Sequence, residues 1–281
     1  MLKKLSIVSI AILFLFGNLL ATQSGAVQSS DGVSIHYSSY GKAAKTLLFI
    51  HCWCGDSTFW EKQVDQFSKT YRVVVLDLAG HGKSGMERKE YTIPAFAEDV
   101  ATVIKKLDLK EVILIGHSMG GPVMIATAAL FPKRVKALVA VDTLHMVEFK
   151  WPEASFKARI AAMESDFKKA TTAFIGSMIP PGTDKSVREK IIATTSGTNA
   201  KVGIGAMKGL YRFKLIEAMA KIKKPIYCVN GSMWPTNTAM GAKHALSFKA
   251  KIIAGGGHFP HMEKPAEFNK AFAEILKELQ F

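Results

Sequence analysis

Cysteine is scarce in this sequence, since only Cys52, Cys54 and Cys228 occur among 281 residues. A small odd count supplies no disulfide framework and leaves at least one free thiol or one intermolecular bond. Cys52 and Cys54 are also too close in sequence for an easy bridge, given the geometry that a disulfide demands. His51 beside them makes the segment look like metal ligands, but no second cluster with zinc-type spacing accompanies it. We therefore expect neither a disulfide-stapled domain nor a bound metal.

Acidic residues are also in deficit, with 23 Asp and Glu against 37 Lys and Arg and a formal net charge of +14. The basic residues are scattered rather than clustered, and no nucleic-acid-binding motif accompanies them. We expect an ordinary basic surface and no nucleic-acid partner. A weak association with an anionic envelope surface is the alternative.

Long hydrophobic runs are absent except at the N-terminus. A positively charged start is followed by an almost wholly apolar stretch over residues 5–20 and by the small residues Ser24 and Ala26. This is the order of a secretory signal peptide, and the stretch is short for a membrane span of about 20 residues. We predict a signal peptide over residues 1–26 and export to the periplasm or the medium, with an uncleaved membrane anchor as the alternative.

The rest of the chain alternates short apolar runs with amphipathic segments, which predicts alternating strands and helices. Such alternation indicates an α/β fold whose mostly parallel sheet carries helices on both faces. The pattern is interrupted over residues 146–221, a stretch rich in Met and Phe with no β-branched run, and we predict an inserted helical lid there between core segments 27–145 and 222–281. The expected strands cover residues 32–38, 46–50, 72–77, 111–115, 134–141, 225–230 and 249–253, and the expected helices cover residues 58–67, 91–107, 121–131, 239–246 and 260–279.

The candidate nucleophile lies in the segment Gly116-His117-Ser118-Met119-Gly120. A predicted strand precedes this segment and a predicted helix follows it, which is the context in which a G-x-S-x-G motif presents a reactive serine. The flanking glycines leave room for the strained turn. The backbone N–H of Met119 lies at the start of the helix, where unpaired donors favour negative charge. The pattern therefore predicts Ser118 as nucleophile and Met119 as one oxyanion donor.

A serine needs a neighbouring base to remove its proton, and histidine is the usual choice. His258 follows the last predicted strand in a glycine-rich loop that can carry it over the sheet edge. His261 is the rival, but it falls in the first turn of the last predicted helix. His117 adjoins the nucleophile and is expected to point elsewhere. We predict His258 as the base.

The acid that orients the base is harder to find, because no Asp or Glu occurs between Glu217 and Glu263. Asp142 directly follows the strand after the nucleophile helix and gives the chain order Ser…Asp…His. Asp77 also ends a strand, but it precedes the nucleophile and is expected to tie down its own glycine turn. We predict Asp142 as the acid, with a Ser–His dyad as the alternative.

The second oxyanion donor is expected in the loop that follows the strand at residues 46–50. The backbone N–H of Trp53 is the preferred donor, and that of Cys54 is the adjacent alternative.

Four segments of the chain, taken in order, resemble the α/β-hydrolase superfamily, in particular its lid-bearing serine esterases and related single-domain hydrolases. The segments are His51-Cys-Trp-Cys-Gly-Asp56, Asp77-Leu-Ala-Gly-His-Gly-Lys-Ser84, Gly116-His-Ser-Met-Gly-Gly121 and Gly257-His-Phe-Pro-His-Met-Glu-Lys-Pro265.

The chain departs from the superfamily pattern in two places. Cys52 stands where the family usually has glycine, and the usual acid position after the lid, near Ser232, is vacant. Some members of the family carry the acid where Asp142 stands. A serine at position 118 disfavours the members that use an aspartate nucleophile.

The resemblance and the residues together predict an exported serine hydrolase of the carboxylesterase type. It would cleave an ester of a small, modestly hydrophobic molecule through an acyl-enzyme on Ser118, without a cofactor. An amide, a lactone or a carbon–carbon bond is an alternative target. A ligand-binding or sensing protein with slow or vestigial hydrolysis is the alternative class, and a surface-anchored structural protein is a third.

Overall fold

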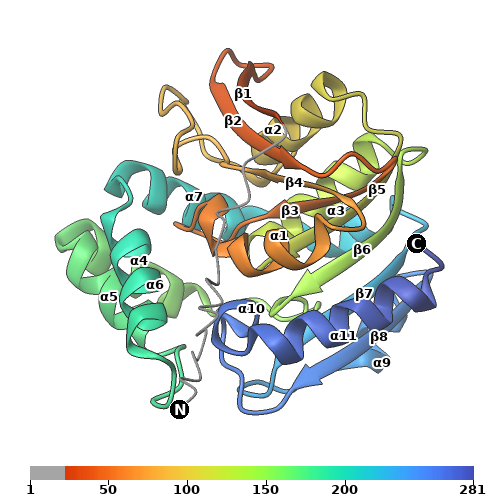
Figure 1. Ribbon diagram of the computed structural model, residues 1–281. Helices are drawn as coiled ribbons and strands as arrows, with labels where there is room; N and C mark the ends of the chain where they lie inside the picture. Colours follow the sequence, from red (N-terminus) through yellow and green to blue (C-terminus); the bar gives the residue numbers. More distant parts are fainter. Residues whose placement is uncertain (1–22) are drawn as a thin grey trace, which may run out of the picture.

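The computed structural model describes residues 23–281, in which one eight-stranded sheet has the order β1-β2-β4-β3-β5-β6-β7-β8 (Figure 1). β1 and β2 run antiparallel to their neighbours, and every pairing from β4 to β8 is parallel. This confirms the predicted α/β class. The strands are β1 (Gln23–Gln28), β2 (Ser34–Tyr40), β3 (Lys45–Ile50), β4 (Arg72–Leu76), β5 (Glu111–His117), β6 (Val135–Val141), β7 (Pro225–Gly231) and β8 (Ser247–Ile253).

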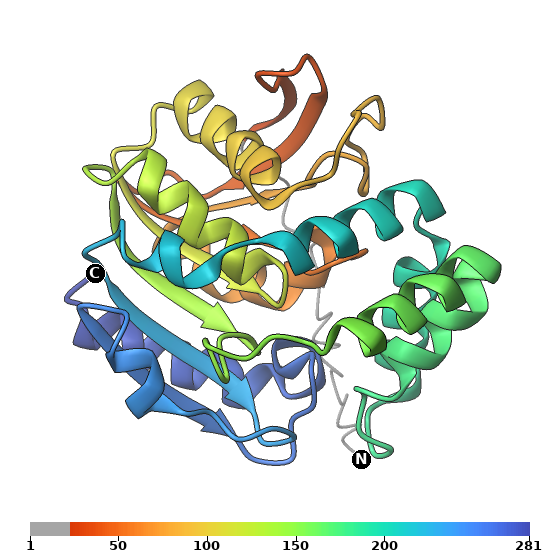
Figure 2. The ribbon, with the colours of Figure 1, turned by 180° about the vertical axis from the view of Figure 1, so that it is seen from behind.

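Helices cover both faces of the sheet, because the central strands are buried on both sides and each face needs an apolar layer. A 3-10 turn η1 (Ser57–Trp60), α1 (Glu61–Phe67) and α11 (Pro265–Glu278) cover one face, seen at the front of Figure 1. α2 (Ile93–Lys106) and α3 (Gly120–Leu130) cover the other face, seen in Figure 2. Two short helices, α9 (Thr238–Ala242) and α10 (Pro260–Glu263), complete the C-terminal part.

Between β6 and β7 the chain forms α4 (Glu153–Ser165), α5 (Phe167–Gly176), α6 (Lys185–Gly197), α7 (Ala200–Arg212) and α8 (Leu215–Met219). We call α4–α7 the lid helices, and Figures 1 and 2 show them to one side of the sheet. α8 instead packs against α3 of the core, and its Met219 is fully buried. The lid boundary predicted at residue 221 therefore differs from the packing, because α8 shares the core's apolar interior.

The predicted leader falls mostly on residues 1–22, outside the described residues. Its last four residues, 23–26, belong to β1, which pairs with β2 from Gln23 opposite Ser39 to Gln28 opposite Ser34. A cut after Ala26 would remove most of this strand, so the predicted boundary disagrees with the sheet. The strand escaped the sequence pattern because it is an edge strand with exposed and half-exposed side chains and no apolar alternation.

The predicted last helix is also interrupted. α10 ends at Glu263, and Lys264 has the non-helical angles φ −135° and ψ 57° before α11 begins at Pro265. Proline disfavours helical angles in the residue before it, which explains the break.

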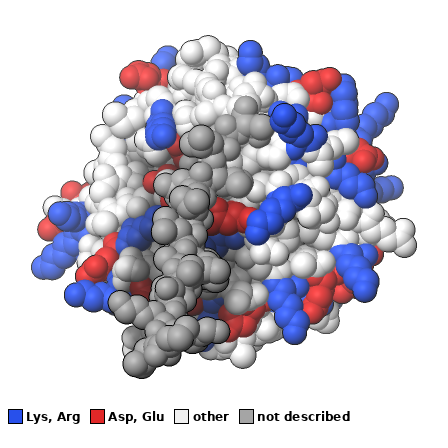
Figure 3. Space-filling view, in the orientation of Figure 1, with Lys and Arg blue, Asp and Glu red and all other residues white. Residues whose placement is uncertain are grey.

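On the face shown in Figure 3, Lys and Arg side chains are dispersed over the surface, with Asp and Glu side chains among them. Within residues 23–281, no helix combines the length and the apolarity needed to span a bilayer.

Candidate active site

Three side chains from separate strand ends meet at the carboxyl edge of the sheet. Ser118 follows β5, Asp142 follows β6, and His258 lies in the loop after β8. The Nε2 atom of His258 is 2.9 Å from the Ser118 Oγ atom, and its Nδ1 atom is 2.6 Å from Asp142 Oδ2. Parallel strands present their carboxyl ends at one edge, so positions 140 residues apart become neighbours.

The turn that carries Ser118 is strained and tightly packed. Ser118 has φ 51°, in the left-handed region that non-glycine residues rarely occupy. A Cβ atom on Gly116 would collide with the carbonyl oxygen of Gly120, and one on Gly120 would lie 2.5 Å from the carbonyl oxygen of Ile50. Both glycines are therefore required by close backbone contacts.

Asp142 is fully buried and held by several donors. The backbone N–H of Gly231 donates to Oδ1 at 2.8 Å, His258 approaches Oδ2, and the Nε2 atom of His145 lies 3.4 Å from Oδ1. Burial would raise the pKa of Asp142, but the contacts with His145 and His258 outweigh burial and hold it below the ordinary value. The side chain is therefore a carboxylate at neutral pH and can accept a hydrogen bond from the Nδ1–H group of His258.

The backbone around His258 is held on all sides. Its N–H donates to the carbonyl of Met178, two residues after the end of α5, at 3.0 Å. Its carbonyl lies 2.6 Å from His117 Nε2, which assigns a proton to that nitrogen because a carbonyl can only accept. The Glu263 carboxylate accepts the N–H groups of the two flanking residues, at 2.5 Å from Gly257 and 3.2 Å from Phe259. Burial raises the pKa of Glu263.

Sequence reasoning missed two of these contacts. The sequence pattern predicts only that His117 points away from the nucleophile, and it assigns no role to Glu263. The spacing was a usable signal for Glu263, because an acidic residue five positions after a loop histidine, at the start of a helix, can reach back to the loop N–H groups.

The rival base and the rival acid have other partners. His261 is fully buried and stacks on Trp60 with ring centroids 4.3 Å apart. Asp77 accepts the N–H of Lys83 in its own turn at 2.9 Å and that of Ser57, at the start of η1, at 2.8 Å. Neither side chain reaches Ser118.

The expected oxyanion donors come from two loops, the one that follows β3 and the turn that carries Ser118. Met119 is the N-cap residue of α3. Within the part of the chain that the structure describes, the backbone N–H groups of Trp53, Cys54 and Met119 donate to no acceptor. The Trp53 side chain is anchored to the lid, since its Nε1–H donates to the carbonyl of Gly203 at 2.7 Å. Trp53 and Cys54 thus both stay open as the second donor.

The three cysteines are free and buried. Burial raises the pKa of all three thiols well above the ordinary value, so they are protonated at neutral pH. The Cys52 side chain fills space beside Gly55, where an added Cβ atom would lie 2.8 Å from its sulfur.

Buried histidines predict acid sensitivity. Burial lowers the pKa of His261 to about 3, and neither ring nitrogen has a hydrogen-bond partner. Because this folded-state pKa is depressed, stability is fully present above the unfolded value near 6.5 and is lost as the pH falls toward 3. We expect His261→Phe to recover about 2 kcal/mol of the unfolding free energy lost between pH 7 and pH 4.5.

Urea titrations at the two pH values measure this difference. Parallel wild-type and His261→Phe curves would contradict the expectation.

The sequence profile of the alpha/beta hydrolase fold family matches residues 45–169. The dihydrolipoyllysine-residue acetyltransferase component of an acetoin cleaving system from Cupriavidus necator is 28% identical over 251 residues, covering 88% of this chain and 67% of that protein. The 2-(acetamidomethylene)succinate hydrolase of Mesorhizobium japonicum is 27% identical over 244 residues, covering 82% of this chain and 87% of that protein.

Among solved structures, a thermophilic esterase from Thermogutta terrifontis has a TM-score of 0.79 and 22% identity, and the match covers 92% of this chain and 100% of the esterase. A likeness at this identity shows a shared fold.

Proposed function

Because this chain belongs to the α/β-hydrolase superfamily, we propose that it is an exported serine hydrolase that cleaves carboxylic esters of small, modestly hydrophobic molecules. The contact chain from Ser118 through His258 to Asp142, with separations of 2.9 and 2.6 Å, is the observation that supports this proposal most directly. A hydrolase and an esterase among the similar proteins agree with the reaction class.

The mechanism follows from these contacts. His258 takes the proton of Ser118 as the oxygen attacks the ester carbonyl, and the buried Asp142 carboxylate stabilises the resulting imidazolium. Backbone N–H groups at Met119 and at Trp53 or Cys54 bind the negative charge that develops on the carbonyl oxygen. His258 then protonates the leaving alcohol, and a water activated by the same imidazole releases the acid from Ser118.

An aromatic side chain beside the base supports an apolar substrate. The Trp234 ring meets the His258 ring edge-on at 5.8 Å, and 37% of the Trp234 surface stays exposed. Trp234 lies in the loop after β7, where no carboxylate is present. We infer that it offers a contact surface for the apolar part of the ester.

A series of p-nitrophenyl esters tests this function. We expect turnover of the acetate and a higher kcat/KM for the butyrate, because each buried methylene contributes about 0.8 kcal/mol, roughly fourfold in rate. A fluorophosphonate probe should label Ser118 in the folded protein and not after denaturation. Absence of both turnover and labelling would favour the alternative of a binding protein with vestigial hydrolysis.

Export is part of the proposal and is supported by the charged and apolar pattern at the start of the sequence. Because β1 begins at Gln23, the cut is expected at or before residue 22. N-terminal sequencing of exported protein tests this expectation, and an intact N-terminus would point to an anchor instead.

A further inference from the structure

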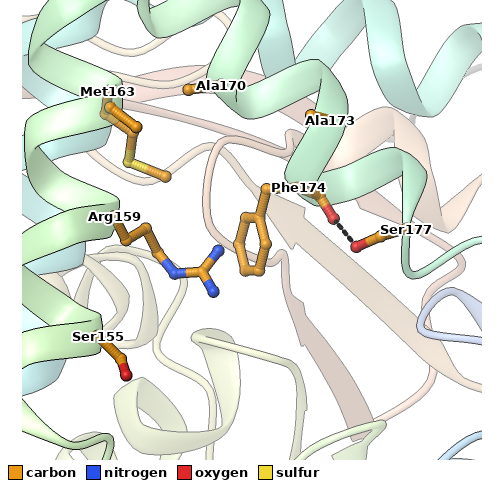
Figure 4. Close-up of a pocket in the computed structure, with 8 residues that line it drawn as sticks. Ser155, Arg159, Met163, Ala170, Ala173, Phe174 and Ser177 are labelled. Atoms are coloured by element: carbon orange, nitrogen blue, oxygen red, sulfur yellow. Dashed lines mark hydrogen bonds between the residues drawn. The ribbon is translucent and has the colours of Figure 1, made fainter.

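A pocket of about 470 Å³ lies between lid helices α4 and α5 (Figure 4), and none of the three side chains of the candidate active site lines it. Its walls are mainly apolar and include Met163 and Phe174, while Ser155, Arg159 and Ser177 contribute polar atoms. This volume lies within the range of sites that hold small organic molecules. The pocket therefore combines an apolar surface with one fixed positive charge.

The charge of Arg159 is not neutralised within the part of the chain that the structure describes. No carboxylate there forms an ion pair with it, and its buried Nε atom has no hydrogen-bond partner. Two other arginines, Arg88 and Arg134, are by contrast paired with aspartates. Partial burial without a compensating anion lowers the pKa of Arg159. Buried charges are usually paired with an opposite charge, and the Arg159 guanidinium has no such partner among the described residues.

Aromatic rings hold this guanidinium in place. Its central carbon lies 3.9 Å from the ring centroid of Phe174 and 4.7 Å from that of Trp151. Figure 4 shows the Arg159 side chain reaching from α4 toward Phe174 on α5. Stacking restricts the side chain and leaves the two terminal nitrogens of the guanidinium free to donate. A planar guanidinium matches the two oxygens of a carboxylate.

We propose that this lid pocket is a binding site for a small organic carboxylate, whose oxygens contact Arg159 and whose apolar part rests on Ala170 and Phe174. The apolar walls favour an organic acid over a fully hydrated inorganic anion, because only the former buries hydrocarbon surface. The inference is independent of the proposed hydrolysis, since binding requires none of the three residues that meet at the sheet edge.

The pocket also contacts the loop that is expected to hold the oxyanion. The ring of Phe174 meets the ring of Trp53 at 6.1 Å with an interplanar angle of 64°. An acid bound against Phe174 is therefore one side chain away from a candidate oxyanion donor.

Titration calorimetry with sodium benzoate tests the proposal, using the wild type and Ser118→Ala so that turnover plays no part. We expect benzoate to bind both proteins, benzyl alcohol to bind neither, and Arg159→Met to weaken benzoate binding by about tenfold or more. Arg159→Lys keeps the charge but loses the two-pronged geometry, so it should also bind benzoate more weakly than the wild type.

Lys157→Met is the matched control, because it removes the same charge from the same helix at a side chain that is paired with Glu153 and lies outside the pocket. It should leave benzoate affinity unchanged. Equal benzoate affinity in Arg159→Met and the wild type would overturn the proposal. So would equal affinity for benzyl alcohol, or binding of inorganic phosphate as strong as that of benzoate. The Lys variant keeps the test decisive if Arg159→Met does not fold.

Discussion

Ser118→Ala is expected to lower kcat for p-nitrophenyl butyrate by roughly 10⁴- to 10⁶-fold, because it removes the atom that forms the acyl-enzyme. The fold should persist, since alanine places the same Cβ atom at the φ of 51° that serine already occupies. Purified variant and wild type are compared by steady-state kinetics and by their circular dichroism spectra.

Ser68→Ala is the control, because the hydroxyl of Ser68 has no hydrogen-bond partner and lies at the end of α1. It should keep wild-type kinetics. If Ser118→Ala retained more than about one hundredth of the wild-type kcat, a nucleophile other than Ser118 would have to be sought.

Asp142→Asn is expected to lower kcat by about 10⁴-fold with a smaller change in KM. The carboxylate accepts a hydrogen bond from His258 Nδ1–H at 2.6 Å, whereas an amide can turn an N–H donor toward that nitrogen. The imidazole would then carry its proton on Nε2, facing Ser118, and could not act as the base.

Asp56→Asn is the matched control, since Asp56 caps η1 through the N–H of Thr58 and asparagine caps helices equally well. The kcat and KM of Asp56→Asn for p-nitrophenyl butyrate should equal those of the wild type. Near-wild-type activity of Asp142→Asn would reject Asp142 as the acid and favour a Ser–His dyad.

The pKa of Asp142 also determines what its ionisation contributes to stability. Because that pKa is depressed in the folded protein, its contribution is present above the unfolded value near 3.9 and is lost only as the pH falls below it. The loss of stability expected between pH 7 and pH 4.5 therefore belongs to buried histidines such as His261 rather than to this carboxylate.

Local features of the sequence were enough to predict most of the elements and the three residues that meet at the sheet edge. The periodicity of apolar residues that marks a strand or a helix involves residues close in sequence. The central strands and their helices can therefore be predicted from this periodicity alone. The G-x-S-x-G segment, the glycine loop before His258 and the lack of acidic residues between Glu217 and Glu263 then singled out Ser118, His258 and Asp142.

The tertiary structure alone decided the features that depend on partners distant in sequence. β1 is a strand because β2 pairs with it, and α8 belongs to the core because α3 packs on it. The contact of His117 with the carbonyl of His258, and the position of Arg159 between Phe174 and Trp151, have no signature in the sequence. A sequence pattern predicts which face of its helix or strand a residue lies on. Contacts between helices and strands depend instead on how the whole chain folds.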